Sequence, residues 1–127
     1  MRFISLTLLI LFSAAVLQSF FPWWSLVVAA FACGYFMPLR LRIHSLWAGF
    51  IAGFLLWSVY ALYLNMTNDG LLTTKIGDLL GGVPALSLPV LSGLFAGILS
   101  GMGALSGRLG KGLLERKPEE NRQIKNA

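Results

Sequence analysis

The sequence predicts an all-α membrane protein, with four transmembrane helices in an antiparallel bundle and one short amphipathic helix at the membrane surface. Hydrophobic residues make up 57% of the 127 residues and charged residues only 12%, which is about half the charged fraction of a soluble domain. The charged residues fall into a few short groups. Between these groups lie three uncharged stretches, 3–39, 43–68 and 79–107, and each is long enough to cross a bilayer.

The first uncharged stretch is too long for a single span, because as one helix it would extend roughly 55 Å across a hydrocarbon core of about 30 Å. It divides naturally at Pro22, Trp23 and Trp24. Proline favours the first turn of a helix, and tryptophan favours the headgroup region of the bilayer. We therefore expect one span over 3–21 and a second over 23–39, with Trp23 and Trp24 as interfacial anchors.

The first predicted span has a second interpretation as a cleaved signal peptide. Arg2, the apolar run after it and the small residues Ser13, Ala14 and Ala15 are compatible with such a peptide. The run is longer than the usual apolar core of a signal peptide, and the small residues match a cleavage site poorly. We expect the span to be retained, and mass spectrometry of the N-terminus distinguishes the two interpretations.

The other uncharged stretches predict spans over 43–64 and 83–107, the latter with Pro84 and Pro89 in its first turns. On a helical wheel at about 100° per residue, small residues cover one half of the last span and form a glycine zipper. They also cover one face in the first half of span 43–64. Helices in lipid associate through close backbone approach, so both are expected packing faces. Their glycines are Gly49, Gly53, Gly93, Gly97, Gly101, Gly103 and Gly107.

These small faces allow two arrangements. In the first, the faces of the last two spans meet within one chain, because the spans are antiparallel neighbours in the sequence. In the second, the face of the last span lines an interface between copies of the chain. Replacing Gly97 and Gly101 with leucine would disrupt folding in the first arrangement and mainly the oligomer in the second.

Residues 69–80 separate the last two spans and predict a short amphipathic helix on the outer membrane surface. Asn68 or Asp69 can cap its start, and Gly81–Gly82 can end it. The segment carries the only charged residues at this end of the bundle, which are Asp69, Lys75 and Asp78. These charges make it a candidate lid or docking element, and the alternative is an interfacial linker helix.

Nine of the ten basic residues lie at the opposite end of the predicted bundle. The positive-inside rule then predicts that both termini are cytoplasmic. We expect a four-helix membrane domain over 1–110 and a disordered basic tail over 111–127. A basic tail beside a bilayer is a topology signal and a contact for anionic lipid headgroups, so no nucleic-acid partner is predicted despite a pI near 9.9.

The predicted spans lack the groups that catalysis requires. None contains a carboxylate, which a proton relay or an intramembrane acid protease would need. His44 and Cys33 are the only histidine and cysteine, so one chain cannot assemble a metal site from them. We therefore expect neither an enzyme nor a cofactor.

The chain resembles a family of uncharacterised small four-span bacterial membrane proteins. The resemblance rests on Pro22–Trp24 after the apolar N-terminus, on Asn68–Leu72 leading to Lys75, and on Gly103–Gly107 closing the last span. These motifs are short, but the resemblance spans most of the chain. The resemblance implies a multi-pass protein of the bacterial cytoplasmic (inner) membrane and brings no activity or site residues with it.

Two functions remain after these exclusions. Extensive small-residue faces and few extramembrane residues favour a non-enzymatic accessory or assembly subunit of a larger membrane complex. The alternative is a small homo-oligomeric channel or transporter, with the glycine-rich face of the last span near the pathway. A search for partners in native membranes tests the first function, and flux through liposomes of the pure protein tests the second.

Overall fold

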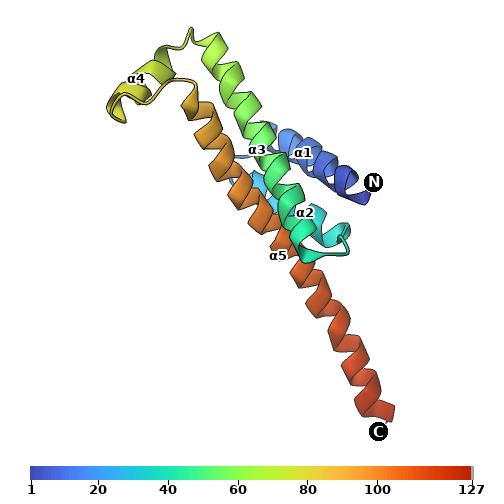
Figure 1. Cartoon of the computed structure of the whole chain (residues 1–127). Coiled ribbons are helices and arrows are strands. Elements are labelled where there is room, and N and C mark those ends of the chain that lie inside the picture. Colours follow the sequence, from blue (N-terminus) through green and yellow to red (C-terminus); the bar gives the residue numbers. More distant parts are fainter. Residues whose placement is uncertain (127) are drawn as a thin grey trace.

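The computed structural model describes the backbone of residues 1–126 and their side chains except those of 116–120. This part of the chain is all-helical, as predicted. Figure 1 shows α3 and α5 as a long antiparallel pair, with α1 and α2 beside its lower part. The helices are α1 (Arg2–Phe20), α2 (Ser25–Phe36), α3 (Arg42–Thr67), α4 (Leu71–Leu79) and α5 (Ser87–Asn126).

Three of these helices, α1, α3 and the first part of α5, are long and apolar enough to cross a membrane. The predicted second span over 23–39 is shortened to α2, whose 12 residues extend only roughly 18 Å at about 1.5 Å per residue. At its start, Trp23 and Trp24 lie in a turn in which the Ser25 N–H donates to the Pro22 carbonyl (3.0 Å). At its end, Pro38 disfavours the helical conformation of the residue before it, and Met37 leaves the helix with φ −123° and ψ 69°.

The last helix differs from its prediction at both ends. It begins at Ser87 rather than near residue 83, so Pro84 precedes it. Pro89 lies in the first turn, where no intrahelical hydrogen bond is lost. At the other end, the expected disorder over 111–127 is not what the structure shows, because α5 continues as helix to Asn126, and residue 127 lies outside the described residues. We call Arg108–Asn126 the α5 arm.

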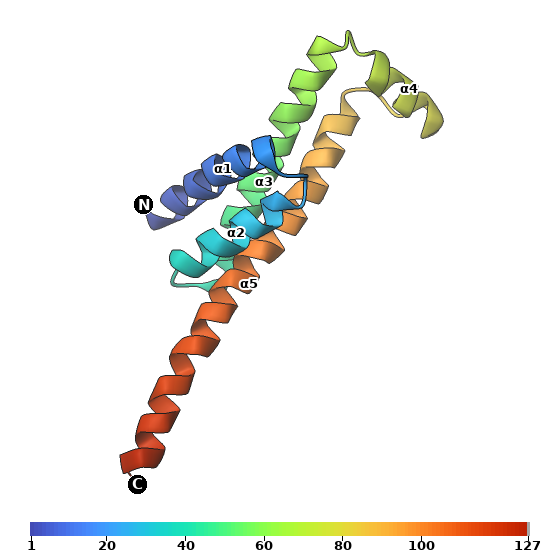
Figure 2. The same cartoon turned by 180° about the vertical axis from the view of Figure 1, so that it is seen from behind.

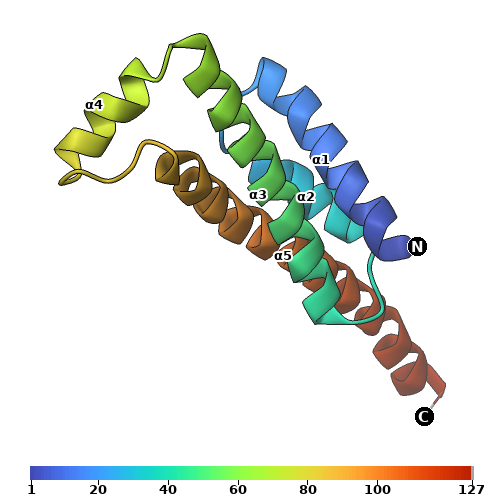
Figure 3. The same ribbon diagram turned by 45° about the horizontal axis from the view of Figure 1, so that its top comes forward.

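Helix α5 is the centre of the bundle. It packs against α3 along most of the membrane part and against α2 beside the lower half of α3. The α1–α2 hairpin lies across this pair, as Figures 2 and 3 show. In the apolar part of α5, 44% of residues are buried, against 17% in α1. The core is therefore built around α5, and α1 is peripheral.

The two ends of the bundle differ in charge. One end, which we call the basic end, contains four segments: the start of α1, the loop with Arg40, the start of α3 and the α5 arm (Figure 1). Rings of Phe3 and His44 meet edge to face there, with centroids 6.2 Å apart, which joins α1 to α3. The other end, formed by α4 and its two loops, we call the α4 end.

Candidate functional site

The predicted small faces of α3 and α5 lie against each other in the structure. A Cβ atom added to Gly49 would lie 2.6 Å from the Ser100 carbonyl oxygen, and one on Gly53 would lie 2.6 Å from that of Ala96. From the other side, Gly97 and Gly101 approach carbonyl oxygens of α3 in the same way, at 2.9 Å, and Gly93 approaches Ser58. The close approach is made within one chain, and these glycines let the two backbones come together.

The remaining glycines of this face contact α2. A Cβ atom added to Gly103 would lie 2.9 Å from the Val27 carbonyl oxygen, and one on Gly107 would overlap that of Phe31. Gly34 of α2 makes a similar close approach to α5, because a Cβ atom there would overlap the Ala104 carbonyl oxygen. Sequence reasoning did not identify Gly34, although a lone glycine in an apolar helix was the available signal.

The two predicted interfacial tryptophans lie in the turn between α1 and α2, and both are exposed. Trp23 lines a cavity of about 440 Å³ together with Gln18, Trp57 and Tyr60. Gln18 Nε2 and Trp57 Nε1 are buried there, and neither has a hydrogen-bond acceptor in the part of the chain that the structure describes. Trp57 was not singled out from the sequence because it lies inside a span, away from any expected interface.

Helix α4 lies where the amphipathic helix was expected, but it is shorter than 69–80 and has no side-chain cap. Asp69 and Gly70 both have positive φ, 49° and 71°, and form the turn before the helix. Among the described residues, neither Asp69 nor Asp78 forms an ion pair with Lys75. The structure therefore places Lys75 and Asp78 on α4 and Asp69 in the turn before it, without joining the three charges into a site.

Helix α4 is attached to the bundle through polar and backbone contacts. The Thr73 hydroxyl donates to the Asn65 side-chain oxygen of α3.

The helix ends in a Schellman motif, in which the Gly82 N–H donates to the Gly77 carbonyl (2.9 Å) and the Gly81 N–H to the Asp78 carbonyl (3.2 Å). Gly81 and Gly82 have φ near 88°, so the predicted stop at these glycines is where α4 ends.

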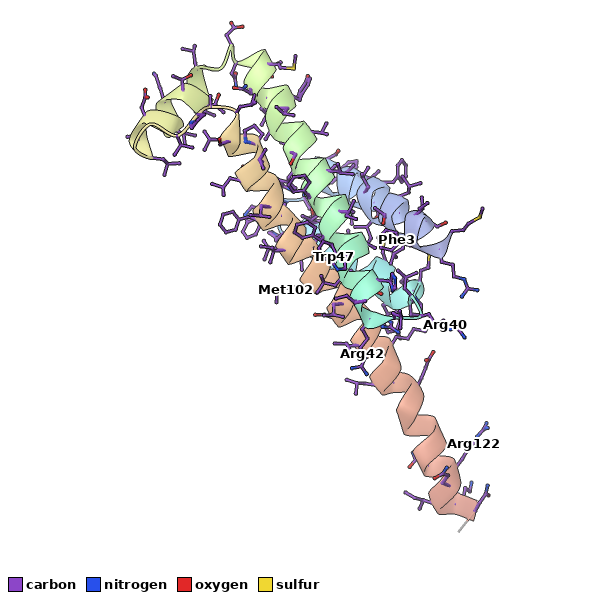
Figure 4. The ribbon with its side chains drawn as sticks, in the orientation of Figure 1. Phe3, Arg40, Arg42, Trp47, Met102 and Arg122 are labelled. Carbon is purple, nitrogen blue, oxygen red and sulfur yellow. The ribbon has the colours of Figure 1, made fainter. Side chains whose placement is uncertain are left out.

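At the basic end, the loop before α3 and the start of the α5 arm enclose a cavity of about 310 Å³. We call it the basic cavity. Arg42 at the first turn of α3 lines it, together with Arg108, Lys111 and Glu115 of α5 and the ring of Pro38. Figure 4 shows Arg40 and Arg42 where α5 leaves the bundle, with Arg122 far along the arm. The cavity is thus lined by three cationic side chains and one carboxylate.

Arg108 joins the two sides of this cavity. Its Nη2 donates to the Arg40 carbonyl oxygen at 2.7 Å, across 68 positions of sequence. Its Nη1 is buried and has no acceptor among the described residues. Lys111 Nζ lies 4.0 Å from the Glu115 carboxylate, whose side chain is 70% exposed. An arginine held by one hydrogen bond keeps its remaining donors oriented, which is the arrangement that binds oxygen anions.

Other reactive side chains are spread over the bundle. The Cys33 thiol lies 3.3 Å from the Ser13 hydroxyl, and His44 contacts Phe3. Within residues 1–126, apart from the side chains of 116–120, no three His, Cys, Asp or Glu residues lie close enough to hold a metal ion. The basic cavity is therefore the candidate functional site with the most concentrated chemistry.

Comparison of the chain with protein-family models, curated proteins and solved structures gives no match.

Proposed function

We propose that this protein is a non-enzymatic accessory or assembly subunit of a larger membrane complex. The bundle anchors the chain in a bilayer, and the α5 arm is the element that a partner recognises. The proposal places the chain in a bacterial cytoplasmic membrane, with both termini on the cytoplasmic side, because nine of the ten basic residues lie at the basic end.

One observation carries the proposal: α5 continues beyond the bundle as a helix, and among the described residues only the first turns of this arm, which hold Arg108 and line the basic cavity, lie beside another element (Figure 1). The arm extends roughly 28 Å at about 1.5 Å per residue. Cβ atoms added to Gly110 or Gly112 would meet no described atom within 4 Å. A helix of this length that contains two glycines and Pro118 is marginal in water by itself. A partner that covers the arm would supply the missing stability.

The arm also carries an apolar stripe, which we define as Leu109, Leu113 and Ile124. On a helical wheel at about 100° per residue, the three lie within about 60° of one another. They are 38%, 68% and 69% exposed. A narrow stripe of this kind suits a partner helix that packs along the arm.

The alternative of a homo-oligomeric channel has less support. In the structure α2 and α3 cover the small-residue face of α5, which would otherwise line the interface between copies. The uncovered face of α5 carries bulky apolar side chains, such as Leu94, Phe95 and Met102, which suit contact with lipid.

The test is photo-crosslinking in native membranes, followed by purification in mild detergent and identification of adducts. A photoreactive residue in place of Leu113 should give a discrete heteromeric adduct. The same residue in place of Arg122, on the opposite side of the arm, is the matched control and should give much less. Equal labelling at both positions, or recovery of the protein as a lone monomer, would contradict the proposal.

A further inference from the structure

We propose that the basic cavity binds the phosphate group of an anionic membrane lipid. The site lies at the junction of α3 and the α5 arm. The proposal does not rest on a partner for the arm, although Leu109 and Leu113 belong both to the cavity wall and to the apolar stripe. Its cationic side chains are Arg42, Arg108 and Lys111, and its carboxylate is Glu115.

Arg108 carries the assignment. One of its terminal nitrogens is occupied by the Arg40 carbonyl oxygen at 2.7 Å, and the other, Nη1, is buried without an acceptor among the described residues. A buried charged donor without an acceptor is costly, and an oxygen anion in the cavity removes that cost. Phosphate fits this requirement because its oxygens accept several charge-assisted hydrogen bonds at once.

The start of α3 adds a second source of positive potential. Leu41 precedes the helix and makes no side-chain cap, so the first backbone N–H groups of α3 have no capping side chain. Such N–H groups and the positive end of the helix dipole favour an anion near the first turn. Arg42 is the first residue of α3 and lines the basic cavity, so this potential acts at the same place as the arginines.

The position of the cavity favours a lipid over a soluble phosphate. The uncharged part of α3 begins directly after Arg42, so the cavity lies where the hydrocarbon core ends and headgroups begin. Pro38, Leu109 and Leu113 give its wall apolar surface beside the cations. Basic cavities between helices at this depth suit an anionic headgroup with acyl chains beside it.

Glu115 makes the proposal testable in two directions. Its carboxylate lies 4.0 Å from Lys111 Nζ and competes with a phosphate for that cation. Removing the carboxylate should strengthen binding, whereas removing a cation should weaken it. A purely structural role for these residues predicts no such opposite effects.

The experiment uses the full chain in nanodiscs of phosphatidylcholine with a small fraction of phosphatidylglycerol, and native mass spectrometry counts the bound phosphatidylglycerol. Arg108→Gln should weaken binding about tenfold, the value of one charge-assisted hydrogen bond. Arg42→Gln should also weaken it, and Glu115→Gln should strengthen it. Arg122→Gln is the charge-matched control, because it lies roughly 21 Å along the arm, beyond a Debye length of about 8 Å.

Unchanged phosphatidylglycerol binding in both Arg42→Gln and Arg108→Gln would overturn the proposal. A loss of binding in Arg122→Gln equal to that in Arg108→Gln would also overturn it, because it would indicate diffuse attraction to the arm. Inorganic phosphate is the second probe. If it binds in pure phosphatidylcholine nanodiscs with the same dependence on Arg108, the site takes a free anion and the lipid assignment is wrong. If Arg108→Gln fails to fold, Lys111→Gln and Glu115→Gln still test the opposite effects at the cavity.

Discussion

The two halves of α5 use the same residue type in opposite ways. In the membrane half, glycines from Gly93 to Gly107 bring the helix against backbone atoms of α2 and α3. In the arm, Cβ atoms added to Gly110 or Gly112 would contact no described atom, and glycine at these positions weakens the helix. A glycine in a helix is therefore informative only together with what lies opposite it, and substitutions that add atoms distinguish the two halves.

The largest effect is expected from Gly49→Leu, at the centre of the α3–α5 contact. The added side chain would meet the Ser100 carbonyl oxygen at 2.6 Å and the Gly101 Cα at 2.9 Å, and backbone atoms cannot move aside cheaply. We expect a loss of at least about 3 kcal/mol in the free energy of unfolding. Unfolding in mixed detergent micelles, followed by tryptophan fluorescence, measures it. Gly112→Leu is the control, and equal losses in both variants would refute the close contact.

A smaller loss is expected from Gly107→Ala, at the last contact before the arm. A single methyl group there would overlap the Phe31 carbonyl oxygen of α2. Overpacking of this kind typically costs about 1–3 kcal/mol. The matched variant Gly110→Ala lies one turn further along the same helix and should not destabilise the bundle. If the two variants have the same unfolding midpoint, the boundary between the halves lies elsewhere.

Gly81→Ala tests a glycine that is required for its conformation rather than for contact. No atom lies within 4 Å of an added Cβ, but the residue has φ +88° in the Schellman motif that ends α4. A left-handed conformation costs an alanine about 1–2 kcal/mol. Hydrogen exchange of the amides in 76–83 should accelerate, while the α3–α5 pair is unchanged. Unchanged exchange in this segment would contradict the motif.

The smallest effect is expected from Gly112→Ala, and it has the opposite sign. Alanine favours a helix over glycine by about 1 kcal/mol, and no neighbour opposes the added methyl group. Amide exchange over the arm should slow, with no change in the stability of the bundle. A faster exchange in the arm would show that Gly112 is needed for a contact.

Local patterns predicted several elements well. The all-helical fold, the location of α3 and the end of α4 at Gly81–Gly82 follow from charge spacing and turn residues. The position of Pro38 also contained the reason why α2 is short, because proline restricts Met37. Charge spacing alone predicts a longer span, because the uncharged run continues to residue 39.

Other features depend on tertiary contact and have no local signal. The hydrogen bond from Arg108 to the Arg40 carbonyl joins residues 68 positions apart, so the basic cavity follows only from how α5 packs beside α3. Disorder was the prediction for the basic tail over 111–127, which forms most of the arm. In the structure it continues a helix that packing has already nucleated, which removes the cost of starting one.

The unbroken course of α5 has a mechanical consequence. In the proposed bilayer setting, and as long as the helix stays continuous, a change of about 10° in the tilt of α5 would displace the tip of the arm, roughly 28 Å away, by about 5 Å. Helices tilt further in thinner bilayers. In the proposed bilayer setting, the position of the tip would therefore follow the thickness of the membrane.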